Sequence, residues 1–471
     1  MPQMTPTIPG VPQELLDRLR RHGQEHVLRW WHQLDGTERA ELLAQLGKLD
    51  LEQLARLYAD RGRTFVLPAP EKIKPALVDR LDTDATELRL AGETALRKGE
   101  LAVLVVAGGQ ATRLGTPYPK GMFPIGPVTQ KTLFQIHAEK TLALCRQFSV
   151  KIPFLVMTSP ATDEETRDFF NDHHYFGLPH DEVHFFCQGT MPALDLSTGK
   201  LLLEKPGRLF TSPNGHGGTI VALAESGLLA RLSRQGIRQI FYFQVDNPLV
   251  KVVDPLFLGH HLAKQAQVSS KVVAKEGPED KLGNMVVVDG RCTIIEYSDL
   301  PAELARQTDA GGKLRIWAGS PAIHLFALEF LQQIAESGEQ MPFHTAKKKV
   351  PFLDENGATI HPQAENALKF EKFIFDVLPS ADRWTAVETT RKEEFVPLKN
   401  ATGADSPDMV RQAMSDLAAD WLTQAGVKVP RQVDGSAAVP LEISPLYALD
   451  ARQLASKVDA RLRIDGPTYV E

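Results

Sequence analysis

The chain has 471 residues, of which 43% are hydrophobic and 24% are charged, and its 53 Lys and Arg residues against 59 Asp and Glu residues give a net charge of −6. This length suits about three domains, and the composition excludes a disordered or collagen-like chain. Because the overall charge is negative, no global field attracts nucleic acid, and an anionic ligand needs a local site.

The sequence also lacks the signs of an oxidised or membrane-bound protein. Cys145, Cys187 and Cys292 are far apart and form no C-x-x-C pair, which argues against a disulfide framework and a thiolate zinc site. The longest apolar run, 101–107, has the length of a strand, well short of the roughly 20 residues of a membrane span. The first twelve residues do not resemble a signal peptide. We therefore expect a cytoplasmic protein with no membrane or nucleic-acid partner.

The N-terminal region has a helical pattern. Apolar residues recur at three- and four-residue steps over 12–63. Asp35-Gly36 interrupts the pattern, and Asp50 is suited to cap the next helix. The pair Trp30-Trp31 is interpreted as packing residues, with a partner surface as the alternative. These features predict a helical N-terminal region over 1–98.

From Leu101 onward, short apolar runs alternate with helical patterns. The strand-like runs lie at 101–107, 153–158, 182–188, 237–245, 269–275, 284–289 and 293–298. The helical patterns between them lie at 131–145, 163–173, 220–233 and 254–265. This alternation predicts an α/β domain over 99–400 with a mostly parallel, helix-covered sheet. A helix and shorter runs after a turn-rich stretch predict a small α+β C-terminal domain over 401–471.

The loop after the strand-like run 101–107 contains residues that are suited to bind phosphate. Gly108 and Gly109 have no side chains where the chain leaves the strand, so backbone N–H groups can approach a nucleotide closely. Arg113 and Lys120 supply a planar guanidinium and a compact ammonium for phosphate oxygens. The spacing fits neither the G-x-G-x-x-G fingerprint nor the P-loop, because Thr116 follows Gly115 and the lysine comes later.

Several motifs in a fixed order carry a family resemblance. They are AGGQATRLGTPYPKG at 107–121, NDHHYFGL at 171–178, CQGTMPALD at 187–195, PNGHGGTIVAL at 213–223, VDNPLVKVVDP at 245–255, IIEYSDL at 294–300, FHTAKKKVPFLD at 343–354, FEKFIFDVLP at 370–379, EEFVPLKNA at 393–401 and LEISPL at 441–446. Together they resemble the UDP-sugar pyrophosphorylases (UDPGP type 1), closest to the eukaryotic type of UDP-N-acetylglucosamine pyrophosphorylase. The resemblance implies a Rossmann-like, mostly parallel mixed sheet of the nucleotide-diphospho-sugar transferase type.

The resemblance also implies roles for individual residues around the nucleotide. Gly108 and Gly109 would hold the uridine end, while Gln188 and the turn that contains Gly215 and Gly217 would read the uracil. A glutamine suits this task because its amide donates and accepts at once.

Charged residues would act on the phosphates. The resemblance implies that Arg113 clamps the departing pyrophosphate, that Lys120 lies at the α-phosphate, and that Lys399 meets the sugar phosphate. Asp246, at the end of a strand, would hold Mg²⁺, a cation that takes few protein ligands and keeps waters and phosphate oxygens. Without the resemblance, an aspartate in such a turn is more often a cap.

The sugar pocket implied by the resemblance contains six residues. They are Gly283, Glu296, Tyr297, Ser320, Phe373 and Phe375. Tyr297 and the two phenylalanines are equally well explained as core residues of alternating strands. Ser320 ends the sequence Trp-Ala-Gly-Ser, where N-acetylglucosamine enzymes of the family show Asn-Ala-Gly-Asn.

Two further departures concern the nucleotide loop and the glycine turn. Ala111 stands where the family has glycine, and a left-handed backbone there would cost alanine about 1 kcal/mol. His216 stands where the N-acetylglucosamine branch has asparagine, and the glucose 1-phosphate branch often has this histidine. The identity of the sugar therefore stays open between the two branches.

These observations lead to one expected reaction and two alternatives. We expect a UTP:sugar-1-phosphate uridylyltransferase that joins UTP to N-acetylglucosamine 1-phosphate and releases pyrophosphate by in-line attack on the α-phosphorus. The first alternative is the same reaction on glucose or galactose 1-phosphate, and the second is a UDP-sugar-binding sensor or scaffold without catalysis. Its partners would be UTP and a hexose 1-phosphate, and it would be a monomer or weak homo-oligomer.

Overall fold

A computed structural model describes residues 7–62, 67–81, 85–337 and 341–471 of the chain. The described residues form two compact units. The smaller unit contains those of Met1–Val66, Gly189–Gly218 and Met341–Phe373, and the larger unit those of Leu67–Gln188, Thr219–Gln340 and Ile374–Glu471. Residues 67–98, which the sequence pattern grouped with the N-terminal helices, thus fall within the range of the larger unit.

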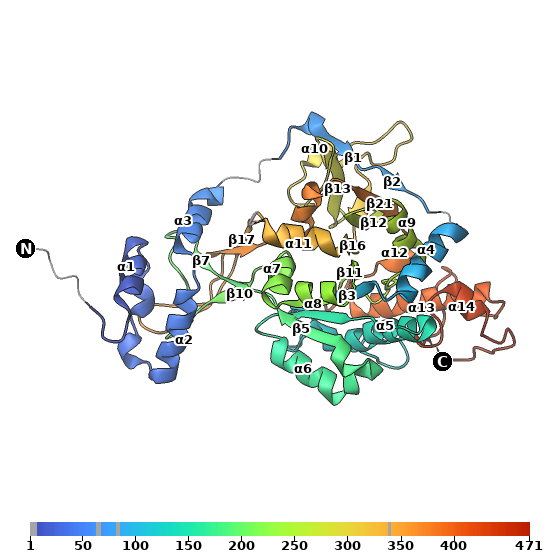
Figure 1. The fold of residues 1–471 in the computed structure, drawn as a ribbon, viewed down its shortest axis with the longest axis horizontal. Helices are drawn as coiled ribbons and strands as arrows, with labels where there is room; N and C mark the ends of the chain where they lie inside the picture. The colour runs from blue at the N-terminus through green and yellow to red at the C-terminus, as the bar shows by residue number, and fades with distance from the viewer. Residues whose placement is uncertain (1–6, 63–66, 82–84, 338–340) are drawn as a thin grey trace, which may run out of the picture. The chain divides into compact units, whose positions relative to one another are not determined.

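The larger unit is built on a mixed sheet with 12 strands among the described residues (Figure 1). The main path of this sheet runs in the order β1 (Ile73–Pro75), β13 (Gly283–Val288), β15 (Ala318–Ser320), β12 (Val268–Ala274), β16 (His324–Ala327), β11 (Gln239–Gln244), β3 (Leu101–Val106), β4 (Phe154–Thr158) and β5 (Val183–Cys187). Beside this path, β14 (Arg291–Ile295) pairs with β13, while β21 (Trp384–Glu388) pairs with β12 and β2 (Val78–Asp79). The expected α/β fold with a mixed central sheet is confirmed.

Four neighbouring strands, β11, β3, β4 and β5, run parallel to one another. Their sequences are nearly continuous apolar runs, as expected for strands that are covered on both faces. In β3, the side chains of Val103 and Val105 are fully buried in one hydrophobic core with Phe154 of β4 and Phe241 of β11. The carboxyl ends of these parallel strands lie at the same edge of the sheet, so residues distant in sequence meet there.

Helices and short helical turns cover this sheet and connect its strands. The α-helices are α4 (Thr86–Arg97), α5 (Leu133–Phe148), α6 (Asp163–Asp172), α7 (Gly218–Glu225), α8 (Leu228–Arg234), α9 (Pro255–Ala263), α10 (Ala302–Ala305), α11 (Leu328–Glu336), α12 (Arg391–Glu394), α13 (Pro407–Gln424) and α14 (Ala451–Ala455). The 3₁₀ turns are η4 (Pro70–Lys72), η5 (Thr112–Leu114), η6 (Lys120–Met122), η7 (His174–Gly177), η8 (His180–Glu182) and η9 (Ile374–Ser380). The helices predicted from periodicity are therefore present, with the predicted 220–233 helix divided at Gly227.

Helices α4 and α9 cross at very short range. A Cβ atom added to Gly92 of α4 would lie 1.9 Å from the carbonyl oxygen of Pro255, and one added to Gly259 of α9 would lie 1.7 Å from that of Leu88. Only glycine fits at these two positions without moving a helix. Nothing in the local sequence distinguishes these two glycines from other helical residues. The need for glycine arises from the packing of one helix against the other.

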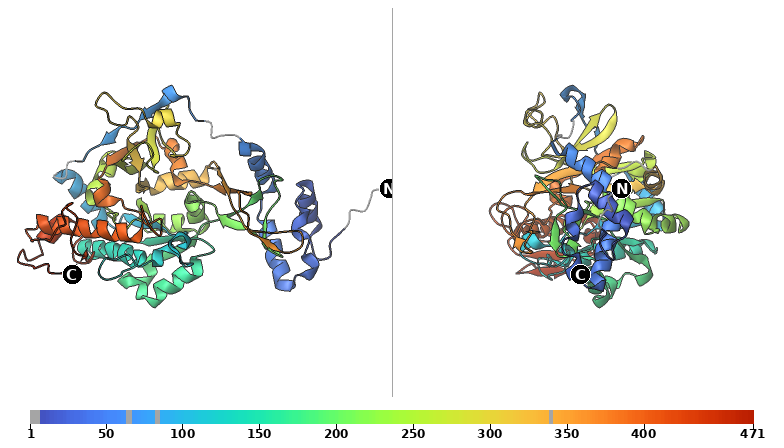
Figure 2. Two further views of the ribbon diagram at one scale, coloured as in Figure 1. Left: turned by 180° about the vertical axis from the view of Figure 1, so that it is seen from behind. Right: turned by 90° about the vertical axis from the view of Figure 1, so that its left-hand side faces the viewer.

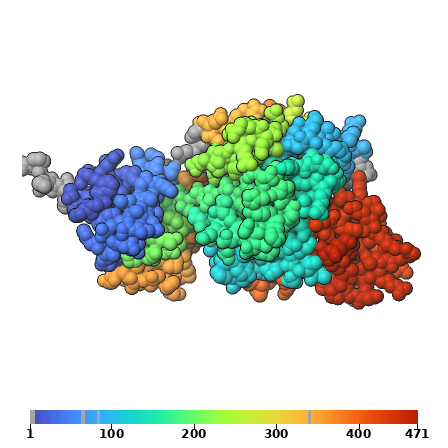
Figure 3. Space-filling view, turned by 60° about the horizontal axis from the view of Figure 1, so that its bottom comes forward, coloured from blue at the N-terminus to red at the C-terminus, as the bar shows by residue number. Residues whose placement is uncertain are grey.

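The C-terminal residues of the larger unit form their own hydrophobic cluster. Leu422 of α13, Leu454 of α14 and Leu441 of β22 (Leu441–Ile443) are fully buried in it, and β22 pairs in parallel with β23 (Thr468–Val470). Figure 3 shows these C-terminal residues, in red, as one compact mass. Helix and short strands thus occur together here, as the sequence pattern predicted.

The smaller unit combines the N-terminal helices with two segments from far along the chain. Its helical elements are α1 (Gln13–Arg21), η1 (Glu25–Leu28), η2 (Trp31–Gln33), α2 (Gly36–Gly47), α3 (Leu51–Ala59) and η3 (Asp60–Gly62). Its strands are β6 (Thr190–Pro192), β7 (Leu194–Asp195), β8 (Leu203–Lys205), β9 (Arg208–Leu209), β10 (Thr211–Pro213), β17 (His344–Lys348), β18 (Phe352–Leu353), β19 (Thr359–Ile360) and β20 (Ala367–Glu371). Figures 2 and 3 show the blue helices beside the green and orange segments that supply these strands.

One core joins these three segments of the smaller unit. Leu19 and Trp31 from the N-terminal helices share it with Leu201 and with Phe370 of β20. Trp31 is buried and its ring N–H donates to the carbonyl of Pro9, so this tryptophan is a packing residue as interpreted. Asp35 closes a capping box at the start of α2.

One helical expectation for the smaller unit is wrong. Residues 25–33 form the 3₁₀ turns η1 and η2 in place of an α-helix. Gly23 stops α1 from continuing into these residues, because it adopts a left-handed backbone with a φ of 65° just after the C-cap His22. Within the described parts of the chain, none of the helices combines the length and apolar character that a membrane crossing requires.

Candidate active site at the carboxyl edge of the parallel strands

Four residues meet at the carboxyl edge of the parallel strands in the larger unit. Gly108 follows β3, Ser159 follows β4, Gln188 follows β5, and Asp246 follows β11. The hydroxyl of Ser159 donates to the carbonyl of Gly108 at 2.8 Å. The backbone N–H of Gln188 donates to Thr158 at 2.9 Å. This edge is where open α/β sheets bind ligands, and the sequence had placed the glycine loop there.

The two glycines of the loop have different tasks. A Cβ atom on Gly108 would lie 2.1 Å from Nε2 of Gln188, so this glycine lets the glutamine pack against the backbone. A Cβ atom on Gly109 would meet nothing within 4 Å, which leaves space beside its backbone. Gln188 is buried, and its Oε1 atom has no hydrogen-bond partner in the part of the chain that the structure describes. A buried, unsatisfied amide oxygen suits a ligand that brings a donor.

Backbone hydrogen bonds fold the rest of the loop back on itself. The N–H of Ala111 donates to Tyr118 and the N–H of Lys120 donates to Gly109, both at 3.0 Å. Ala111 has a φ of −87°, so alanine carries no strain there and the expected cost of the missing glycine does not arise. Arg113 lies on η5 with an exposed side chain, where it can meet a ligand from solution.

Lys120 forms the charged centre of this edge. Its Nζ atom lies 3.3 Å from Oδ2 of Asp246 and 3.3 Å from the carbonyl oxygen of Leu398. Both side chains are mostly buried, with 20% of the Lys120 side chain and 13% of the Asp246 side chain exposed. The N–H of Leu398 donates to the carbonyl of Asp246 at 2.8 Å, so the segment that carries Lys399 is fixed beside the same strand end.

Two basic side chains of α5, the buried His137 and the partly buried Lys140, contact the backbone on either side of Asp246, and sequence reasoning missed both. His137 of α5 contacts the carbonyl of Val245 at 2.9 Å, and burial together with the charge of Lys140 lowers its pKa to about 3, so the ring is neutral. Burial likewise lowers the pKa of Lys140 to about 7, and its amine donates to the carbonyls of Pro248 and Val250. Both residues looked like ordinary members of a helical pattern.

The sugar-binding residues expected in the larger unit fall into two groups. Gly283 of β13 lies opposite Ser320 of β15, and a Cβ atom added to Gly283 would lie 3.6 Å from Oε1 of Glu296, so these three residues are brought together. Tyr297 follows Glu296 in the chain and is 45% exposed. Phe375 is buried within η9, as expected for a core residue.

The remaining predicted residues lie in the smaller unit. Gly215 has a φ of 84°, and its turn packs on the backbone of Lys372, which accepts a hydrogen bond from the N–H of Gly217 at 2.8 Å. The ring centroid of Phe373 lies 5.3 Å from that of His216 and 4.4 Å from that of His344. Burial and the charge of His344 lower the pKa of His216 to about 4, so this ring is neutral near pH 7.

Comparison with known proteins agrees with this geometry. Residues 68–424 match the family described as UTP–glucose-1-phosphate uridylyltransferase. UDP-N-acetylglucosamine diphosphorylase 2 of Arabidopsis thaliana is 36% identical over 96% of this chain and 93% of its own length. UDP-N-acetylglucosamine pyrophosphorylase of Saccharomyces cerevisiae is 34% identical over 86% of this chain and 90% of its own length.

A solved structure shares the fold as well. The uridine diphosphate N-acetylglucosamine pyrophosphorylase of Trypanosoma brucei, solved in complex with an inhibitor, superposes with a TM-score of 0.80 at 27% identity and covers 95% of each chain. The motifs, the parallel edge and these similarities agree. The chain therefore belongs to the UTP–glucose-1-phosphate uridylyltransferase family, a family of nucleotidyltransferases.

Proposed function

We propose that this chain transfers the uridylyl group of UTP to N-acetylglucosamine 1-phosphate, forming UDP-N-acetylglucosamine and pyrophosphate. The observation that carries the proposal is the position of Lys120, whose Nζ atom lies 3.3 Å from the carboxylate of Asp246 at the carboxyl edge of the parallel strands. Relatives that span almost the whole chain are named for UDP-N-acetylglucosamine.

The proposed reaction is an in-line displacement at phosphorus. An oxygen of the sugar phosphate forms a bond to the α-phosphorus of UTP, while the bond from this phosphorus to the bridging oxygen of the β-phosphate breaks and pyrophosphate leaves. Phosphoryl and nucleotidyl transfers of this kind need positioning and charge neutralisation from the protein and no covalent nucleophile. In our proposal Lys120 offsets the charge at the α-phosphate, Lys399 holds the sugar phosphate, and Arg113 binds the departing pyrophosphate.

The uridine end would bind at the glycine loop. Gly109 leaves its backbone accessible, and Gln188 offers a buried amide oxygen to the N–H of the uracil ring. For the smaller unit, the resemblance supports a nucleotide contact by Gly215 and Gly217. The same resemblance supports Phe373 as a wall of the sugar pocket.

We propose Mg²⁺ as the cofactor, with Asp246 as its protein ligand. Among residues 7–62, 67–81, 85–337 and 341–471, no group of three or more His, Cys, Asp or Glu side chains is arranged to hold a metal. One partly buried carboxylate fits Mg²⁺, which takes one or two carboxylates and completes its shell with waters and phosphates. When bound, the ion would offset negative charge on the phosphates.

Glucose 1-phosphate is the second candidate substrate. Ser320 has a short hydroxyl side chain, and its Oγ atom accepts a hydrogen bond from the N–H of Ala322 at 3.3 Å. An asparagine at this position would extend an amide toward the ligand, and the serine does not. A second observation is His216, a histidine that the glucose 1-phosphate branch often has at this position.

A substrate panel tests the proposal. The protein is incubated with UTP, Mg²⁺ and one of three sugar phosphates, which are the 1-phosphates of N-acetylglucosamine, glucose and galactose, and pyrophosphate release is followed by a coupled assay. We expect the highest kcat/KM with N-acetylglucosamine 1-phosphate. A higher value with glucose 1-phosphate would establish the second candidate, and UTP binding without pyrophosphate release from any sugar would establish a sensor.

A further inference from the structure

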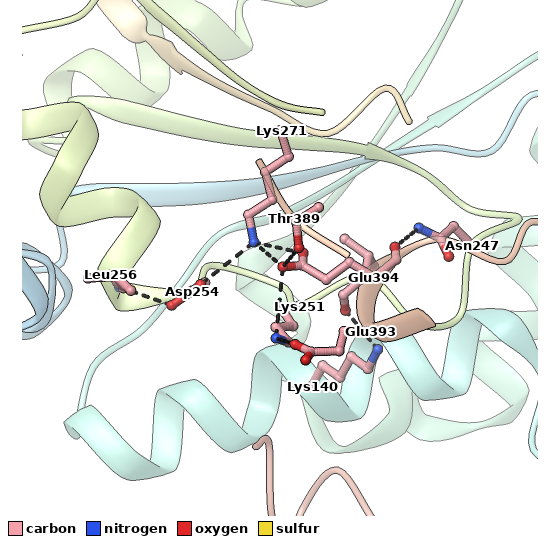
Figure 4. Close-up of polar contacts among 10 residues, drawn as sticks. Lys140, Asn247, Lys251, Asp254, Leu256, Lys271, Thr389, Glu393 and Glu394 are labelled. Carbon is pink, nitrogen blue, oxygen red and sulfur yellow. Dashed lines mark hydrogen bonds and ion pairs between the residues drawn. The ribbon is translucent and has the colours of Figure 1, made fainter. Parts of the chain in front are cut away.

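A cluster of buried polar side chains follows the candidate metal ligand and is not used by the proposed reaction (Figure 4). We call Asn247, Lys271 and Glu394 the buried anchor. Nζ of Lys271, on β12, lies 2.6 Å from Oε1 and 2.7 Å from Oε2 of Glu394. Both side chains are only 2% exposed, and Asn247 is 3% exposed.

Asn247 binds the backbone of the segment that leads to Lys399. Its Nδ2 atom donates to the carbonyl of Glu394 at 2.7 Å, and its Oδ1 atom accepts from the N–H of Val396 at 3.2 Å. The preceding residue, Asp246, accepts from the N–H of Leu398 at 2.8 Å. The chain at 246–247 therefore holds three alternate residues of the segment 394–398, the last of which adjoins Lys399.

Charges around the anchor fix the position of Glu394. Its carboxylate also accepts a hydrogen bond from the hydroxyl of Thr389 at 2.9 Å, and Oδ2 of Asp254 lies 3.6 Å from Nζ of Lys271. Burial would raise the pKa of Asp254, but the charges of Lys271 and Lys251 lower it below its ordinary value. A buried ion pair whose polar atoms all have partners has one favourable geometry. Such a pair fixes the position of its residues more than it adds to the free energy of unfolding.

We infer that Asn247 and Glu394 are positioning residues for the transfer reaction. They fix the segment 394–398 on the end of β11 and thereby set the spacing between the carboxylate of Asp246 and the ammonium of Lys399. This inference rests on the proposed function, which assigns those two groups to the metal and the sugar phosphate. A displacement of about 1 Å between reacting groups can slow a reaction by about 100-fold, so loss of the anchor acts on turnover.

The test compares the Asn247→Ala variant with wild type in the full chain. Alanine removes the donor and the acceptor that hold residues 394 and 396, and the proposed function assigns Asn247 no contact with a substrate. We expect kcat for pyrophosphate release to fall at least tenfold while KM for UTP stays within about threefold. The control is Glu393→Gln, which neutralises the neighbouring carboxylate that pairs with Lys251 outside the anchor, and its kcat should stay within about twofold of wild type.

A second variant covers the case in which Asn247→Ala does not fold. The double variant Lys271→Met with Glu394→Leu removes both charges of the buried pair together, and Lys251 remains as the cation near Asp254. We expect this variant to unfold at a temperature close to that of wild type and to show a kcat at least tenfold lower. A wild-type kcat in every folded variant would overturn the inference, whereas a wild-type protein that releases no pyrophosphate would overturn the proposed function.

Discussion

Some residues at the carboxyl edge can be recognised from the local sequence, and others can be recognised only from the structure. Gly108, Gly109 and Lys120 were found because they lie in one short loop directly after an apolar strand. Asn247 and Glu394 were not, because their hydrogen bond spans 147 residues and a single sequence shows no such pairing. Asparagine is common in turns, so Asn247 alone does not indicate this role.

The two candidate lysines provide the first prediction. We expect Lys120→Ala and Lys399→Ala each to lower kcat at least tenfold, because each removes a positive charge beside the reacting phosphates. Steady-state pyrophosphate release measures the effect, and Lys205→Ala, an exposed lysine of the smaller unit, serves as a control for charge loss alone. Unchanged kcat in either variant would remove that lysine from the proposed mechanism.

Ser320 provides a prediction about sugar preference. Ser320→Asn adds an amide beside Gly283 and Glu296, where it can donate to or accept from an N-acetyl group. We expect the ratio of kcat/KM for N-acetylglucosamine 1-phosphate to that for glucose 1-phosphate to rise about tenfold, the size of one good hydrogen bond. If this ratio does not change, residue 320 does not contact the sugar.

At the level of elements, periodicity predicted the strands and helices of the larger unit well. The four parallel strands are nearly continuous apolar runs because both of their faces are covered, and this pattern is visible without any tertiary information. Periodicity could not predict which segments pack with the N-terminal helices. Their core includes Leu201 and Phe370, which lie more than a hundred residues away in the chain. A local hydrophobic pattern does not indicate which distant segment will pack against it.

The crossing of α4 and α9 provides a prediction about stability. Gly259→Ala places a Cβ atom 1.7 Å from the carbonyl oxygen of Leu88, so the helices must separate. We expect the free energy of unfolding to fall by about 2 kcal/mol, within the range known for overpacked cores. Denaturant unfolding measures this change.

Gly47→Ala in α2 is the matched control for this prediction. A Cβ atom on residue 47 meets nothing within 4 Å, and alanine favours a helix. Equal effects of the two variants on the free energy of unfolding would contradict the packing argument.

At the level of the whole molecule, buried neutral bases make stability depend on pH. Burial lowers the pKa of His137 and of His261 to about 3, with added contributions from the charges of Lys140 and His260. Between the ordinary histidine pKa and about pH 3, the unfolded chain binds protons that the folded chain does not bind. The free energy of unfolding therefore decreases as the pH falls through this range.

This linkage can be measured with one substitution. We expect His137→Gln, which can still donate to the carbonyl of Val245, to reduce the loss of stability between pH 6 and pH 4 by about 1.4 kcal/mol per pH unit at most. Urea unfolding at several pH values provides the comparison. A variant with the same pH dependence as wild type would show that folding does not lower the pKa of His137.

The central claim is that the loop after β3 binds UTP and presents its α-phosphate to Lys120. A crystal structure of the protein with UTP and Mg²⁺ tests this claim most directly. We expect the uracil beside Gln188, the backbone of Gly109 against the nucleotide, and the α-phosphate within hydrogen-bond distance of Nζ of Lys120. A structure in which UTP binds elsewhere, with the carboxyl edge of β3 and β11 closed by the protein's own side chains, would contradict it.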